Sequence, residues 1–363
     1  GTLTVSGNTT LSTIPSVGSD TDMFLMSNAG IVSFATGAEV LAYIGGGSII
    51  GPWVPYVSGS DQIARTEGSA TYNTSLGFQA LEALAVGGDY NTALGGKAGT
   101  AITTGDYNIA LGYNALITED TGNKNVAVGA DVLKNLNYPG DGFNTAVGHN
   151  SGYAMTTGIQ NTLVGGLAGD ALTTGSRNVA MGYGALSTED GDGYNVAIGA
   201  FALEDQNAGI TAYNVAVGYG AGENVTTGPY NTLIGGLAGD AITSGNRNTV
   251  LGYNALSTET TGHRSVAIGT GALRLQNGVG AEVYNTAVGY NAGESMTTGI
   301  QNTIMGSNAG DALTTGSYNV AIGTYALTTE DAHGYNVAIG RNALYYLNAG
   351  ADAYNVAIGF GAG

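Results

Sequence analysis

The stretch Tyr335-Asn336-Val337-Ala338-Ile339-Gly340 decides the fold, because variants of it recur seventeen times between Tyr72 and the end of the 363-residue chain. Asparagine takes the second place in every copy except one, where Ser265 replaces it. Successive copies are mostly 17 residues apart, and every fourth step is longer. The copies therefore fall into blocks of 70 or 71 residues, each with four copies. A fixed period this short predicts a solenoid in which each coil stacks on its neighbours.

Each copy has the pattern of a short strand that ends in a turn. The residue one after the asparagine is Thr, Val or Ile, and the residue three after it is large and apolar. Because side chains alternate along a strand, these two residues share a face, which we expect to fill the coil. Glycine follows in every copy, where the chain must turn. We predict a ladder of asparagines and turn glycines that includes Asn108, Gly112, Asn195, Gly199, Asn336, Gly340, Asn355 and Gly359.

The residue between the two large apolar ones is usually alanine, so both faces of the strand are apolar. Strands that are apolar on both faces are typical of sheets buried on both sides. We expect one face to fill the coil and the other to pack against further copies of the chain, which small residues would allow to approach closely. The predicted packing residues between chains are Ala127, Ala197, Ala267 and Ala338.

The sequences YNVAIG followed by Ala-Leu, at 335–344, and NTAVGYNAG, at 285–293, resemble the head repeat of YadA-type trimeric autotransporter adhesins. They are equally similar to related repeats in phage fibres, and the resemblance covers residues 72–363. It implies an all-β shaft, a repetitive parallel β-roll or β-solenoid of about 17 coils, assembled as an intertwined or side-by-side homotrimer. The longer coil and the periodic insertions of this chain depart from the adhesin pattern.

The first seventy residues lack the repeat and predict a small mixed region. Two apolar runs, 23–26 and 31–35, flank Ser-Asn-Ala-Gly and predict a β-hairpin. A capping-box spacing at 36–39 followed by an apolar run predicts a short helix over 37–44. We expect an N-terminal hairpin-and-helix region at 1–45, a connector at 46–71 and the shaft at 72–363. We expect the shaft either to continue beyond residue 363 or to be truncated there. The order of hairpin and helix resembles segments of phage tail-fibre proteins.

Charge and composition exclude several classes of partner. Nine Lys and Arg stand against 27 Asp and Glu, which gives a net charge of −18. Binding to the phosphates of nucleic acid depends on basic side chains, so we expect no nucleic-acid partner. No apolar run reaches the ~18 residues of a membrane-spanning segment, and we expect no membrane insertion. The chain has no cysteine, which excludes disulfides and thiolate metal sites.

Four longer loops, one in each block, interrupt the 17-residue rhythm at 134–142, 204–212, 274–283 and 345–353. Insertions on one face of a repeat array often form its binding face, although a tolerated surface bulge or a packing clip between chains would look the same. The candidate receptor contacts in these loops are Asn135, Tyr138, Asp205, Gln206, Gln276, Tyr345 and Tyr346.

Two further ladders offer side chains with chemistry. Glu119, Glu189, Glu259 and Glu330 recur at steps of 70, 70 and 71, and we interpret them as solvated turn charges, with a calcium site as the alternative. Tyrosine precedes the asparagine in many copies, and such a ladder predicts packing between coils or a surface that grips sugar rings. The histidines are scattered, and no motif indicates an enzyme or a cofactor.

These patterns, together with the resemblance, predict a non-enzymatic trimeric shaft of a phage tail fibre, located in the virion, that presents elements binding the host surface. Its expected partners are copies of itself, other fibre or baseplate proteins, and a bacterial surface glycan or protein. The alternative is the head of a trimeric autotransporter adhesin on a bacterial cell surface. A third hypothesis is a tailspike that degrades polysaccharide.

Overall fold

The computed structural model describes residues 24–28, 31–35, 61–62, 72–191, 193–278, 280 and 282–363. The chain divides into two compact units, Gly1–Ser58 and Gly59–Gly363. In the first unit, strand β1 (Phe24–Asn28) pairs antiparallel with β2 (Ile31–Ala35). This pairing confirms the predicted hairpin, whereas the predicted helix at 37–44 lies outside the described residues.

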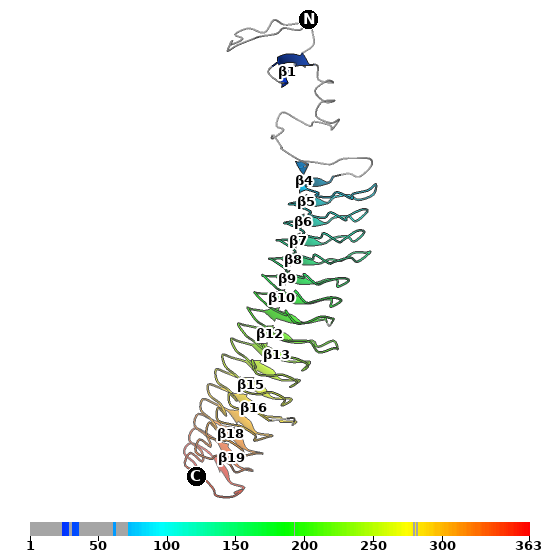
Figure 1. Ribbon diagram of the computed structural model, residues 1–363. Helices are drawn as coiled ribbons and strands as arrows, with labels where there is room; N and C mark the ends of the chain where they lie inside the picture. Colours follow the sequence, from blue (N-terminus) through cyan, green and yellow to red (C-terminus); the bar gives the residue numbers. More distant parts are fainter. Residues whose placement is uncertain are drawn as a thin grey trace, which may run out of the picture. The chain divides into compact units, whose positions relative to one another are not determined.

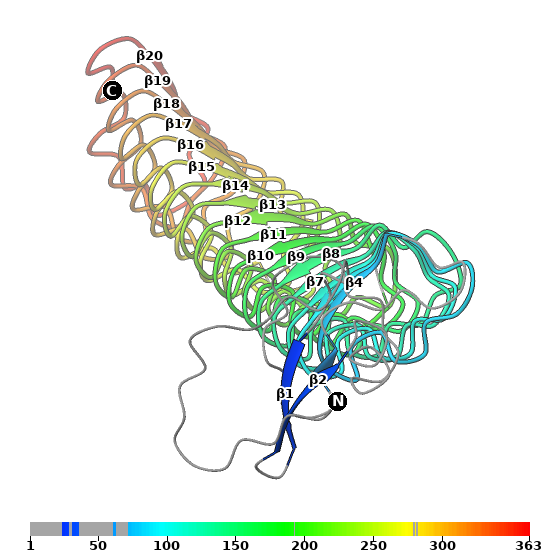
Figure 2. The same ribbon diagram turned by 90° about the horizontal axis from the view of Figure 1, so that it is seen from above.

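The second unit is a β-solenoid (Figure 1). It begins with β3 (Asp61–Gln62), which pairs antiparallel with β4. Seventeen strands from β4 to β20 then pair in parallel, each with the next along the chain (Figure 2). Their bounds are β4 (Thr74–Phe78), β5 (Thr92–Leu94), β6 (Ile109–Leu111), β7 (Val126–Val128), β8 (Thr145–Val147), β9 (Thr162–Val164), β10 (Val179–Met181), β11 (Val196–Ile198), β12 (Val215–Val217), β13 (Thr232–Ile234), β14 (Thr249–Leu251), β15 (Val266–Ile268), β16 (Thr286–Val288), β17 (Thr303–Met305), β18 (Val320–Ile322), β19 (Val337–Ile339) and β20 (Val356–Ile358).

The predicted all-β solenoid of about 17 coils is therefore confirmed, and the described residues contain no helix. The strands are in register, so that Val196 lies opposite Val215 and Ala197 opposite Ala216. Equivalent side chains of successive coils consequently form continuous columns along the stack. Four coils span roughly 19 Å and seventeen roughly 80 Å at the strand spacing of a sheet.

The asparagines form the expected ladder inside these columns. The Asn108 backbone N–H donates to Asn91 Oδ1 at 2.9 Å, and Asn108 Nδ2 donates to the Gly122 carbonyl at 2.7 Å. The same N–H to Oδ1 bond joins Asn195 to its predecessor at 3.0 Å and Asn336 at 2.9 Å. The ladder supplies acceptors and donors to backbone groups that the short strands leave unpaired.

The interior of the coil is the reverse of the one predicted. The alanines expected between chains, Ala127, Ala197, Ala267 and Ala338, are fully buried inside their own coil. The residues on either side of the alanine lie outside. One is Thr, Val or Ile, and the other is large and apolar, as at Ile198, with 36% of its surface accessible. The cause is the buried asparagine: it points inward, and alternation then places the residue two positions later, the alanine, inward as well.

Larger side chains fill the interior from other positions. In half of the coils a leucine eight residues after the asparagine, such as Leu203, is fully buried. The other coils have glycine at this place, and a larger side chain from a nearby position then occupies the space. A side chain at Gly222 would meet Leu233, which replaces alanine in the next strand. Volume is thereby conserved from coil to coil, as close packing of an interior requires.

The turn glycine after each strand is fixed by a close approach between coils. Gly235 has φ of +132°, and a Cβ there would lie 2.6 Å from the carbonyl oxygen of Gly252 in the next coil. Gly112, Gly199, Gly340 and Gly359 have the same positive φ. Neither the conformation nor the spacing admits a side chain in the interior of the stack.

We expect Gly235→Ala to destabilise the solenoid by at least about 2 kcal/mol, because it adds both a strained φ and an overlap with backbone. Gly350→Ala is the matched control, since no atom lies within 4 Å of the added carbon and its φ is not in the left-handed region. Urea unfolding followed by circular dichroism measures both. Equal midpoints for the two variants would contradict the proposed close approach.

Candidate functional site: the long loops and the buried glutamates

The four long loops follow β7, β11, β15 and β19, the corresponding strand of each block. They therefore recur at one place in the coil, about every 19 Å along the stack. Of the predicted contact residues, Asn135 and Asp205 are exposed, and Tyr346 is 82% exposed. Tyr138 and Tyr345 are half-buried.

Gln206 and Gln276 are fully buried, so their prediction as receptor contacts is wrong. Both lie eleven residues after the second residue of their repeat, Asn195 or Ser265, at a place we call the inner turn position. Gln276 Nε2 donates to Glu259 Oε2 at 2.9 Å and to Ser265 Oγ at 2.8 Å, and its Oε1 accepts from Asn285 Nδ2 at 2.9 Å. The repeat itself indicates that this position is buried, because in other copies it holds Ile242 and Leu136, which are typical core residues.

The glutamate ladder also occupies the inner turn position. Glu119, Glu189, Glu259 and Glu330 are all 0% exposed, and the interpretation as solvated turn charges is wrong. A buried carboxylate is costly unless it is hydrogen-bonded. The structure supplies these bonds from two sources, the glutamate's own turn and the long loop of the following coil.

Glu259 shows the arrangement most fully. Its Oε1 accepts from the backbone N–H of Thr260 at 3.0 Å and of Gly262 at 2.7 Å. Its Oε2 accepts from the N–H of Gly278, in the third long loop, at 3.0 Å, in addition to the Gln276 amide. The carboxylate thus connects a turn in one coil to the insertion in the next, and it holds that loop in place.

The first and fourth blocks repeat this pattern with different partners. Glu119 accepts from the N–H of Gly122 at 2.8 Å and of Tyr138, in the first long loop, at 3.4 Å. Glu330 accepts from the N–H of Ala349 in the fourth long loop at 3.1 Å. Burial raises the pKa of Glu119 to about 7, although the hydrogen bonds from Gly122 and Tyr138 act in the opposite direction.

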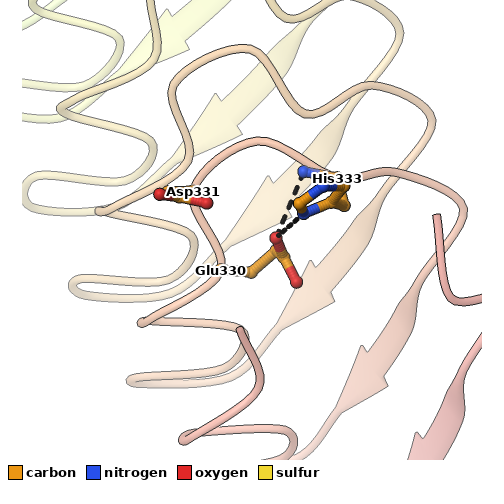
Figure 3. Close-up of side chains that lie close together, drawn as sticks. All are labelled: Glu330, Asp331 and His333. Atoms are coloured by element: carbon orange, nitrogen blue, oxygen red, sulfur yellow. Dashed lines mark hydrogen bonds and ion pairs between the residues drawn. The ribbon is translucent and has the colours of Figure 1, made fainter. Parts of the chain in front are cut away.

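Glu330, Asp331 and His333 form the only close group of metal-ligand side chains among the described residues, with their ligand atoms within 4.8 Å of one another. In Figure 3, Glu330 and His333 face each other. The Glu330 carboxylate already accepts from the His333 backbone and ring nitrogens, each at 3.1 Å. A cation here would have to displace these donors, so the group serves first as a turn cap.

The tyrosines that precede the asparagines stack on one another along the solenoid. Ring centroids lie 4.9 Å apart for Tyr72 and Tyr90 and 4.7 Å apart for Tyr90 and Tyr107, with nearly parallel planes. In some copies an arginine takes the place of the tyrosine. Its guanidinium group then covers a neighbouring ring, as that of Arg177 does over Tyr194 at 5.1 Å. The ring faces are therefore occupied by neighbours, which favours packing over sugar binding for this column.

A surface cavity of about 440 Å³ lies beside the fourth long loop. It is lined by Tyr325, Arg341, Asn342, Tyr345, Tyr346, Gly361 and Gly363. The combination of aromatic rings with guanidinium and amide groups suits a polar ligand that has apolar faces. The equivalent positions of the other blocks carry different residues, so the cavity is a local feature rather than part of the repeat.

No protein family, curated protein or solved structure matches the chain. Among the described residues, no helix has the length and apolar character needed to span a membrane.

Glu259→Ala should release the third long loop, because it leaves the N–H groups of Thr260, Gly262 and Gly278 without their acceptor. We expect limited proteolysis to cut 274–283 first in this variant. Glu282→Ala, which removes an exposed ion pair between the same loop and Arg264, is the control. Exposed ion pairs contribute little, so this variant should leave the cleavage pattern close to that of the wild type. Equal cleavage of the loop in both variants would refute the role of Glu259.

Proposed function

We propose that this chain is a structural shaft, the non-enzymatic and trimeric stem of a phage tail fibre in the virion. The observation that carries the proposal is the outer face of the solenoid sheet. Leu251 is 47% exposed and Met305 is 46% exposed, and equivalent apolar residues follow in every coil. Parallel sheets are nearly always covered on both faces, so this face requires a partner.

Copies of the same chain fit this face. A row of large apolar residues, three positions after each asparagine or Ser265, repeats at the strand spacing through all seventeen strands. A partner must therefore match the same spacing over roughly 80 Å, and an identical solenoid does so by construction. The outward aliphatic residues, rather than the alanines, form the proposed contact between chains. The number three rests on the resemblance to trimeric adhesin heads and fibre repeats.

The trimer is tested by substituting the outer face. Leu251→Glu with Met305→Glu should leave the folded coil intact and dissociate the assembly, because buried unpaired charges at an interface cost several kcal/mol. Asn135→Glu, in an exposed loop, is the control and should remain assembled. Sedimentation equilibrium gives the mass of each. A monomeric wild-type chain would exclude the proposed assembly.

The long loops are the proposed contacts with a bacterial surface glycan or protein. They repeat four times in one chain and twelve times in a trimer, so that weak single contacts would add up to firm attachment. Among the predicted contacts, Tyr346 presents the largest exposed aromatic surface, beside the cavity at the fourth loop. Other fibre or baseplate proteins are the further partners expected for a stem of this kind.

Attachment is tested by adding fluorescent trimer to a panel of bacterial strains. We expect strain-selective binding that Tyr346→Ala, or replacement of 345–353 by a shorter turn, reduces at least several-fold. Tyr113→Ala, an exposed tyrosine outside the loops, is the control. Uniform absence of binding would leave a stem without receptor contacts and contradict the loop assignment.

The alternative, the head of a bacterial trimeric adhesin, shares the trimer and the loop contacts. Selective adhesion to host tissue or matrix, instead of to bacteria, would favour it in the same assay. Release of sugar fragments from bacterial surface polysaccharide would favour the third hypothesis, a degrading tailspike.

A further inference from the structure

The first long loop is held differently from the third. Glu119 accepts hydrogen bonds from backbone N–H groups alone, those of Asp120, Gly122 and Tyr138, and the one from Tyr138 in the loop is long, at 3.4 Å. The inner turn position of the following coil holds Leu136, where the third block has Gln276. The Glu119 carboxylate therefore lacks the side-chain donor that supports Glu259.

No opposite charge compensates Glu119. None of the ion pairs among the described residues includes it, and the charged side chain that acts on it is Asp120, which has the same sign. A fully buried carboxylate that has backbone donors alone, one of them at a long distance, and no cation beside it is better accommodated in its neutral form. When it is ionised, its hydration requires that the loop above it opens.

We propose that Glu119 is a proton-controlled latch for the first long loop, residues 134–142, which closes over the neutral carboxyl and opens when the carboxyl is ionised. The latch is a property of the chain itself. Its biological meaning, regulation of a surface-contact loop by pH, rests on the function proposed above.

The direction of the pH dependence follows from linkage. In the closed state burial raises the pKa of Glu119 to about 7, whereas a hydrated glutamate in the open state has the ordinary value near 4.5. The closed state therefore binds the proton more tightly. Lowering the pH from about 8 to about 5.5 favours closure, by a factor of about thirty in the opening equilibrium.

The other charges around this loop are accounted for. Lys124 pairs with Asp141 at 2.6 Å and Lys134 with Asp131 at 3.0 Å, and both carboxyl groups have pKa values lowered by these lysines or by neighbouring hydrogen bonds. Both carboxylates therefore stay ionised throughout the range concerned. His149 also acts on Asp131, so the experiment includes a variant without it.

The test is hydrogen exchange of the wild-type chain at about pH 8 and about pH 5.5, corrected for the intrinsic effect of pH on exchange. We expect the protection of the peptide that contains Tyr138 to rise on acidification by one to two orders of magnitude. The third loop, 274–283, serves as the internal reference and should change much less, because four donors hold Glu259.

Three variants test the mechanism separately. Glu119→Gln should keep the first loop protected at both pH values, since its side chain carries no charge. Leu136→Gln supplies the amide found in the third block and should hold the loop closed at the higher pH. His149→Asn should retain the wild-type response. Equal protection of the wild-type loop at both pH values, or an unchanged pH response in Glu119→Gln, would overturn the latch.

The outcome separates the latch from the proposed function. Exchange is measured on the purified chain without a receptor, so failure there refutes the latch alone. A working latch in a chain that binds none of the tested bacteria would instead refute the attachment role of the loops.

Discussion

The buried asparagine of each coil is the constraint on which the rest of the structure depends. Its side chain points into the coil and bonds to the backbone that leads into the next strand. In Asn108, Oδ1 accepts from the Asn125 N–H at 3.0 Å and Nδ2 donates to the Gly122 carbonyl. Once this side chain is inside, the alternation of a strand places the alanine inside and the large apolar residues outside. The cross-section, the choice of interior residues and the character of the outer face all follow from that orientation.

Much of the architecture was readable from the sequence, because a repeat gives the same information many times. The strand positions, the number of coils, the turn glycines and the asparagine ladder were all predicted. The hairpin β1–β2 was predicted as well, from two apolar runs around a Gly-containing turn. Such features depend on local spacing, which a single chain displays directly.

The inside and outside of the coil were predicted the wrong way round, and the error has a physical origin. Size suggested that the larger residues fill the interior. Ala197, however, lies two residues after Asn195 and shares its inward face, whereas Ile198 lies three residues after it and points outward. The charge of Glu119 and the polarity of Gln276 likewise suggested solvent. Both occupy the column of Ile242 and Leu136, so alignment of the copies by position, rather than inspection of residue type, would have placed them in the core.

The four-coil block has a consequence for how such a chain changes length. Each block begins and ends on the same in-register strand pairing, as between Ala197 and Ala216, so a block inserted or lost leaves the remaining strands in register. Recombination between blocks would therefore alter the reach of the molecule in steps of roughly 19 Å. The gene can in this way encode molecules of different lengths, in which a long loop held by a glutamate recurs once in every block.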